Sequence, residues 1–184
     1  EDEVFAHYAA IAEATDLPLC IYNNPSTTHF TFSPALLQRL AEIPSLAAVK
    51  MPLPADGDFG SEVARLRTDL PEGFTIGYSG DWECAAALLA GADAWFSVVA
   101  GLLPEPALKL ANAARSGDAA ETARLQAAFQ PLWSLFRAHG SLRVVYAAAN
   151  LKGLTDAQPP RPILPMPQDQ HPQLAEALSA LEKL

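Results

Sequence analysis

Short apolar segments alternate with helical patterns along the first part of the chain, and this alternation constrains the fold more than any other feature. We expect strands at residues 19–22, 46–50, 74–78 and 94–99. One helical pattern precedes the first strand, and others lie between successive strands, the last of them over residues 82–90. Strands and helices that alternate in this way form parallel sheets with crossover helices.

Two α/β architectures fit this order, an open doubly wound sheet and a closed eight-fold barrel. The open sheet is disfavoured because no Gly-x-Gly-x-x-Gly or Gly-x-x-x-x-Gly-Lys phosphate loop follows any expected strand. A whole barrel needs about 250 residues, whereas this sequence has 184 residues. We therefore predict the second half of a TIM (β/α)8 barrel at residues 1–103, and we expect further sequence before Glu1.

After Pro104 the pattern is helical only. Helices are expected at residues 104–115, 118–139, 141–151 and 172–184. Residues 104–184 are therefore predicted to form the last barrel helix and a C-terminal helical extension. The proline-rich stretch 158–167 is too apolar for a free linker, so we expect an extended segment that packs on the body.

Charge and composition exclude several classes of partner. A net charge of -9 argues against nucleic acid and anionic membranes, because phosphate-binding surfaces need clustered Lys and Arg. No apolar run approaches the roughly 20 residues of a membrane span, so we expect a soluble protein. Cys20 and Cys84 match no metal or redox spacing, which predicts reduced, buried thiols and a cytoplasmic location.

Polar side chains stand at the ends of two successive apolar strands. Tyr22 ends the first strand and Lys50 ends the second, so both are expected at one rim of the sheet. Partial desolvation of a lysine at this place disfavours its ammonium form and leaves an amine nucleophile that can form a Schiff base with a ketone. A neighbouring phenol can carry the protons that imine formation and carbon–carbon cleavage require.

Four segments in order carry a family resemblance. They are Tyr22-Asn23-Asn24-Pro25, Val49-Lys50, Ser79-Gly80-Asp81, and Gly91-Ala92-Asp93 leading to Phe96-Ser97-Val98. In order and spacing they resemble the dihydrodipicolinate synthase and N-acetylneuraminate lyase family, and the similarity covers the whole chain. This resemblance implies a barrel with three C-terminal helices, in which the chain supplies strands five to eight and the helical extension.

The resemblance also implies roles for individual residues. Lys50 matches the Schiff-base lysine that attacks pyruvate or a 2-keto acid, and Tyr22 matches the tyrosine that relays protons. Gly80 matches a backbone position that lines the pocket, and Phe96 lies where the eighth strand approaches the pyruvyl group. The resemblance implies no metal and no organic cofactor. It implies a small-molecule keto acid and an aldehyde as partners, and a homo-oligomer, either a dimer or a tetramer.

The sequence departs from the synthase pattern in three places. The synthases commonly have an arginine two positions after the motif proline, which binds the carboxylate of the aldehyde substrate; here Thr27 stands there and offers no bidentate clamp. Met51 follows the lysine where an acidic residue is usual. Segments 140–142 and 159–162 look closer to the 2-keto-3-deoxy sugar-acid aldolases.

These departures favour a class I aldolase or lyase that acts on pyruvate or 2-keto-3-deoxy acids. A 4-hydroxy-tetrahydrodipicolinate synthase that condenses pyruvate with aspartate semialdehyde is one alternative, and a family member that binds a keto acid without turnover is another. Simpler roles also stay open for two site residues. Gly80 can serve only to permit a tight turn, and Thr27 can satisfy nearby polar groups.

Overall fold

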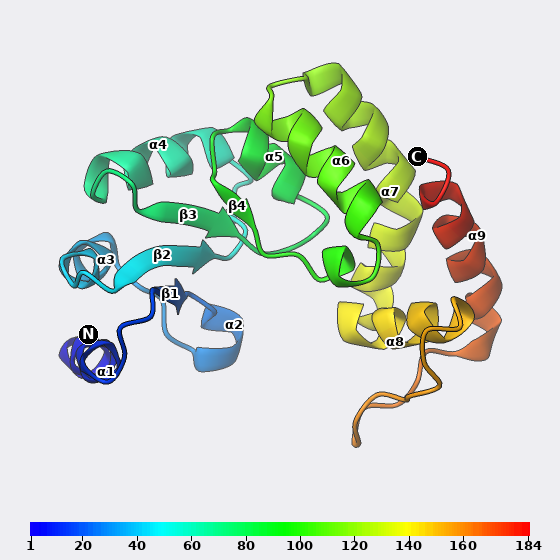
Figure 1. The fold of residues 1–184 in the computed structure, drawn as a ribbon, viewed down its shortest axis with the longest axis horizontal. Coiled ribbons are helices and arrows are strands. Elements are labelled where there is room, and N and C mark those ends of the chain that lie inside the picture. Colours follow the sequence, from blue (N-terminus) through cyan, green and yellow to red (C-terminus); the bar gives the residue numbers. More distant parts are fainter. The chain divides into compact units, whose positions relative to one another are not determined.

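The computed structural model describes residues 1–184 and divides into two compact units, Glu1–Phe96 and Ser97–Leu184 (Figure 1). The first unit contains all the strands, and the second consists of helices and their connections. The predicted change from alternating elements to helices alone is therefore confirmed.

The first unit is a parallel α/β sheet covered by helices. Its four strands lie side by side in the order β1-β2-β3-β4, and each neighbouring pair is parallel. The elements in chain order are α1 (Asp2–Glu13), β1 (Leu19–Tyr22), α2 (Pro25–Thr28), α3 (Pro34–Ala41), β2 (Leu46–Met51), α4 (Phe59–Asp69), β3 (Thr75–Tyr78), α5 (Cys84–Leu89) and β4 (Ala94–Trp95).

Local sequence explains where the crossover helices begin. The side chain of Ser33 accepts a hydrogen bond of 3.1 Å from the backbone N–H of Leu36, and Pro34 occupies the first turn of α3. Asp58 caps α4 in the same way, accepting a bond of 3.0 Å from the N–H of Ser61. Helix α3 then buries three leucines, and α4 buries Phe59, Val63 and Leu66.

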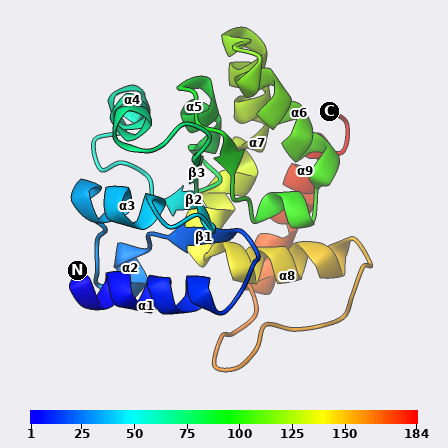
Figure 2. The same ribbon diagram turned by 60° about the vertical axis from the view of Figure 1, so that its left-hand side comes forward.

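One face of the sheet is buried under the helices. Helices α1, α3, α4 and α5 follow one another along this side (Figure 2). Strand residues Ile21, Val49 and Ile76 are fully buried there and belong to one core cluster with helix residues such as Leu36 and Leu66. Because side chains alternate along a strand, the intervening residues point to the other face, which we call the inner face.

The fourth strand is shorter than predicted. We expected residues 94–99, but β4 ends at Trp95, and a 3-10 turn, η1 (Val99–Gly101), follows. Pairing continues for one more step, because the N–H of Phe96 donates a bond of 2.9 Å to the carbonyl of Tyr78. The Ser97 hydroxyl then accepts a bond of 2.9 Å from the N–H of Ala100, which turns the chain out of the sheet.

The second unit is a helical bundle centred on one long helix. It comprises η1, α6 (Pro104–Arg115), α7 (Ala119–His139), α8 (Ser141–Leu151), η2 (Gln168–Gln170) and α9 (His171–Leu181). Residues 104–115 and 141–151 are helical as predicted. The last helix begins one residue earlier than expected and ends at Leu181 rather than at Leu184.

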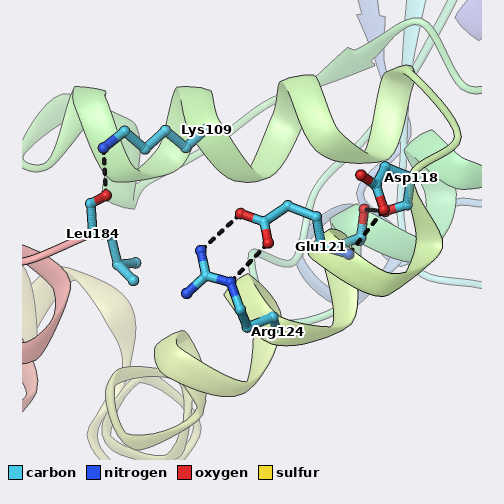
Figure 3. Close-up of polar contacts among 6 residues, drawn as sticks. Lys109, Asp118, Glu121, Arg124 and Leu184 are labelled. Carbon is cyan, nitrogen blue, oxygen red and sulfur yellow. Dashed lines mark hydrogen bonds and ion pairs between the residues drawn. The ribbon is translucent and has the colours of Figure 1, made fainter.

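Polar contacts fix the start of α7, as Figure 3 shows. Asp118 caps the helix by accepting a bond of 3.0 Å from the N–H of Glu121, so α7 begins one residue later than predicted. Arg124 donates two hydrogen bonds of 2.7 Å each to the Glu121 carboxylate.

A further contact in this unit joins α6 to the last residue of the chain. Lys109 of α6 donates a hydrogen bond to the carbonyl oxygen of Leu184.

Aromatic packing forms the core of the second unit. The rings of Phe129 and Trp133 stack with centroids 4.8 Å apart, and both side chains are fully buried. The proline-rich stretch follows α8 as an irregular segment with buried anchors at Pro159 and Met166. Arg143 of α8 also donates a bond of 2.7 Å to the carbonyl of Leu164. The predicted packing of this segment is confirmed at these points.

The two cysteines differ in environment. Cys84 is fully buried on α5, as predicted, and its thiol donates to the carbonyl of Tyr78. Cys20 is exposed, so the prediction that both thiols are buried was wrong for this residue. Cys20 belongs to β1, which has only one neighbouring strand, and its side chain points to the inner face, away from the helices. None of the helices is both long and apolar enough to cross a membrane.

Candidate active site at the carboxyl ends of the strands

Tyr22 and Lys50 are direct neighbours in the sheet. Tyr22 is the last residue of β1 and is paired in register with Lys50 of β2. The N–H of Asn23 donates a bond of 3.0 Å to the carbonyl of Lys50, so pairing extends past the tyrosine. Strand β2 runs one residue further than predicted, to Met51. The structure thus brings together the two residues that the sequence predicted at one rim.

The lysine amine lies over the tyrosine ring. Its Nζ is 4.0 Å from the centroid of the Tyr22 ring, well within the range of a cation–π interaction. Lys50 is half-buried, whereas the Tyr22 side chain is 46% exposed. The ring therefore shields the amine on one side, while much of the tyrosine remains exposed.

Phe96 lies on the same side of the sheet. Its ring centroid is 5.7 Å from the Nζ of Lys50, near the outer limit of a cation–π contact. The structure therefore places the side chain of Phe96 near the amine of Lys50, whereas the sequence had predicted a role for its main chain. Contact between Phe96 and a bound pyruvyl group stays a prediction.

Gly80 occupies the turn after β3. Its φ of +93° lies in the left-handed region, which favours glycine. A Cβ at this position would also lie 2.9 Å from side-chain carbons of Leu53, so the turn and the packing both require glycine. The simpler role in a tight turn accounts for this residue, and its predicted place in the pocket wall stays a prediction.

Thr27 is exposed on the short helix α2, where the sequence led us to expect only a turn. Its hydroxyl accepts a bond of 3.0 Å from the side chain of Asn24, and Thr28 donates a bond of 2.9 Å to the carbonyl of Asn24. Local bonding therefore explains both threonines. Binding of a substrate group by Thr27 stays a prediction.

Asp81 supports the turn that carries Gly80. Its carboxylate is buried and accepts a bond of 3.1 Å from the indole N–H of Trp95 on β4. Helix α5 begins only at Cys84, so Asp81 does not cap it and instead connects the turn after β3 to the next strand.

The buried side chain of Asn23 is only partly satisfied. The amide nitrogen of buried Asn23 lies 3.7 Å from the Met51 sulfur, which is a weak acceptor. The amide oxygen of Asn23 has no hydrogen-bond partner. Met51 therefore supports the Asn23 side chain, next to Tyr22, only through a weak contact with the amide nitrogen.

Gly77 is a residue of this site that sequence reasoning missed. It pairs with Lys50 on one side and Ala94 on the other, at the centre of the row that holds the lysine. The available signal was a glycine inside an apolar strand, a position that often marks a close approach by another group. No group of His, Cys, Asp and Glu side chains is gathered as a metal site.

Comparison with known proteins identifies the family of this chain. The model of the dihydrodipicolinate synthetase family matches residues 1–181. The 4-hydroxy-tetrahydrodipicolinate synthase of an Exiguobacterium species is 32% identical over 180 residues, which cover 98% of this chain and 59% of that protein. The synthase of the same name from Synechococcus elongatus is 34% identical over 183 residues, covering 98% of this chain and 60% of that protein.

A solved structure agrees with the sequence relatives. The crystal structure of a dihydrodipicolinate synthase from Agrobacterium tumefaciens is 60% identical and superposes with a TM-score of 0.95, over 98% of this chain and 61% of that one. This chain thus spans about three fifths of the length of the relatives it matches. By family-model match, sequence identity and fold, the chain belongs to the dihydrodipicolinate synthetase family.

Proposed function

We propose that the protein is a Schiff-base enzyme that acts on pyruvate or a related 2-keto acid. The observation that carries this proposal is the pairing of Tyr22 with Lys50, which sets the lysine Nζ 4.0 Å from the tyrosine ring. A nucleophilic amine and a phenol stand together at the carboxyl ends of parallel strands, where the active sites of such folds lie.

The chemistry begins at the amine of Lys50. Neutral Nζ attacks the ketone carbon of the keto acid and gives a carbinolamine, with a proton moved from nitrogen to oxygen. Protonation of the carbinolamine hydroxyl and loss of water then give a protonated imine, which accepts the electron pair of the adjacent carbon–carbon bond when that bond breaks and the aldehyde leaves. In the reverse sense the resulting enamine attacks an aldehyde. Water finally hydrolyses the imine and restores the amine. The phenol of Tyr22 donates and accepts the protons of these steps.

We place these strands as strands five to eight of a closed eight-stranded barrel. The four parallel strands, the helices on one face and the three-fifths coverage of the relatives support this placement. The inner face would then look into the barrel. Groups that bind the substrate carboxylate are expected from the first half of that barrel.

The preferred reaction is the aldolase or lyase reaction on a 2-keto-3-deoxy acid. Thr27 supports this choice, because a neutral hydroxyl held by Asn24 cannot clamp a second carboxylate. The synthase reaction, pyruvate with aspartate semialdehyde, is the second candidate. The names of the curated relatives favour it, since they are 4-hydroxy-tetrahydrodipicolinate synthases.

A panel of aldehydes tests the choice of reaction in the full-length protein. Pyruvate is held constant and kcat/KM is measured for neutral sugar-derived aldehydes and for aspartate semialdehyde, together with cleavage of 2-keto-3-deoxy acids. The aldolase proposal predicts a higher kcat/KM for the neutral aldehydes. A preference for aspartate semialdehyde would reverse the order of the two candidates. A protein that binds pyruvate but turns over none of these compounds would support the non-catalytic alternative.

We further propose that the protein works in the cytoplasm as a homo-oligomer, a dimer or a tetramer. Two cysteines that form no disulfide support a reducing compartment, and family membership supports the assembly. Sedimentation equilibrium of the full-length protein tests the assembly, and a monomer at micromolar concentration would contradict it.

A further inference from the structure

Gly77 lies between Lys50 and Ala94, its partners on the two neighbouring strands. Its backbone conformation does not require a glycine at this position. Its φ is outside the left-handed region, so another residue could adopt the same conformation. Glycine inside a strand also costs about 0.5–1 kcal/mol relative to alanine. The reason for glycine must therefore be space rather than backbone geometry.

The space at Gly77 is filled by Phe96. A Cβ built on Gly77 would lie 2.5 Å from the Cε2 atom of the Phe96 ring, a distance that real Cβ contacts essentially never show. It would also lie 3.0 Å from the Cβ and the carbonyl oxygen of Ala94. Any side chain at position 77 must therefore displace the ring.

The direction of the strands explains how the ring reaches this place. Gly77 pairs with Ala94, and Phe96 lies two residues beyond Ala94, so its side chain emerges on the same inner face. The ring crosses back over Gly77 toward Lys50, which pairs with Gly77 from the other side. Its centroid ends 5.7 Å from the Nζ of Lys50.

We infer that Gly77 and Phe96 form a positioning pair, in which the missing side chain of one lets the ring of the other act as a second aromatic wall for the Lys50 amine. Tyr22 is the first wall, at 4.0 Å. Ring faces attract cations, and the protonated imine carries a positive charge at this nitrogen. The two rings therefore stabilise the imine once it has formed and keep its nitrogen in place.

This inference rests on the proposed function for its catalytic part, but the packing of the pair can be tested independently. A double-mutant cycle of thermal unfolding uses Gly77→Ala, Phe96→Ala and the double variant of the full-length protein. We expect Gly77→Ala to lower Tm clearly when the ring is present and much less when Phe96 is alanine. An equal loss in both backgrounds would overturn the steric pairing.

The positioning role is tested by the rate at which borohydride traps pyruvate on the protein. Phe96→Tyr keeps the ring and should trap within about twofold of the wild type. Phe96→Leu keeps apolar volume without a ring face and should slow trapping by about 3- to 30-fold, the range of a cation–π contact. Gly77→Ala should slow trapping by a similar factor. If Phe96 only filled space, leucine could replace it. A trapping rate of Phe96→Leu equal to that of the wild type would therefore overturn the inference.

Controls separate this inference from the proposed function. Gly60 on α4 is exposed, has an ordinary φ, and would place a Cβ no closer than 3.5 Å to its nearest neighbour, so Gly60→Ala should not lower Tm and should leave trapping unchanged. Absence of trapping in the wild type would overturn the proposed function and the role of the pair in it. Normal trapping in the wild type and in every variant would overturn the positioning role alone.

Discussion

The Nζ of Lys50 lies over the face of the Tyr22 ring, 4.0 Å from its centroid, and not in a hydrogen bond with the phenol oxygen. The tyrosine therefore offers two separable contributions, a ring face for the amine and a hydroxyl for proton transfer. Substitutions that remove one contribution and keep the other can distinguish them.

Tyr22→Phe keeps the ring and removes only the hydroxyl. We expect kcat to fall by about 10²–10⁴, the usual range for lost acid–base help, while borohydride still traps pyruvate on the protein. Tyr22→Leu removes the ring as well and should slow the trapping step more than Tyr22→Phe does. Steady-state turnover and trapping rates of both variants check this, and full turnover by Tyr22→Phe would remove the hydroxyl from the mechanism.

Substitution of Thr27 tests which aldehyde the protein prefers. Thr27→Arg introduces a side chain that can bind a carboxylate with two parallel hydrogen bonds. We expect kcat/KM for aspartate semialdehyde to rise by about tenfold or more, since such charge-assisted bonds contribute about 1.5–3 kcal/mol. Thr27→Gln, which is long but uncharged, is the control. No gain from arginine would mean that this position does not face the aldehyde.

The phenol of Tyr78 should make the stability of the fold decrease at alkaline pH. Its buried side chain donates a bond of 2.5 Å to the Glu62 carboxylate. Burial, and then the bond to Glu62, raise the pKa of the Tyr78 phenol far above its ordinary value of 10.0. The folded state thus favours the protonated phenol. The contribution of Tyr78 to the free energy of unfolding is therefore complete below pH 10 and is lost as the pH rises above it.

Urea unfolding at several pH values measures this effect. The wild type should lose stability above about pH 10 more steeply than Tyr78→Phe, which has no phenol to ionise. At neutral pH the variant should be less stable by about 1–2 kcal/mol, because it loses one hydrogen bond to a charged group. Identical slopes for Tyr78→Phe and the wild type would contradict the prediction.

Arg67 and Asp93 join the amino ends of the strands. Arg67 pairs with Asp93 at 2.5 Å and also donates to the carbonyls of Phe74 and Gly91. Asp93 in turn accepts a bond of 2.7 Å from the N–H of Ile76. In barrel folds this end contributes to stability and the other end to catalysis.

Arg67→Ala should therefore lower the free energy of unfolding by about 1–2 kcal/mol, since the ion pair is partly exposed but two carbonyls also lose a donor. The kcat of the full-length enzyme should stay within about twofold of the wild type. Urea denaturation and steady-state kinetics check both parts. A large loss of kcat with unchanged stability would show that this end of the sheet takes part in catalysis.

The sequence was sufficient to predict the parallel order of the strands and the meeting of Tyr22 with Lys50. Both follow from local patterns, an apolar run ending in a polar residue and a helix that returns the chain to the same edge. The end of β4 was not predictable in this way, because Val98 and Val99 favour a strand, whereas the Ser97 hydroxyl starts a turn.

The role of Gly77 and the exposure of Cys20 could also not be predicted from the sequence. A glycine in a strand signals a close approach but does not identify the approaching group, which here is the ring of Phe96, just beyond the next strand β4. The exposure of Cys20 depends on which neighbours its strand has, and an apolar run alone does not reveal them.

The most direct test is to locate the covalent adduct. Full-length protein is incubated with labelled pyruvate, reduced with borohydride, digested and sequenced by mass spectrometry, with Lys50→Ala treated in parallel. We predict the label on Lys50 alone in the wild type, and no label but a native circular dichroism spectrum in the variant. Label on Lys109 or Lys152, or no label on a protein that turns over pyruvate, would contradict the account.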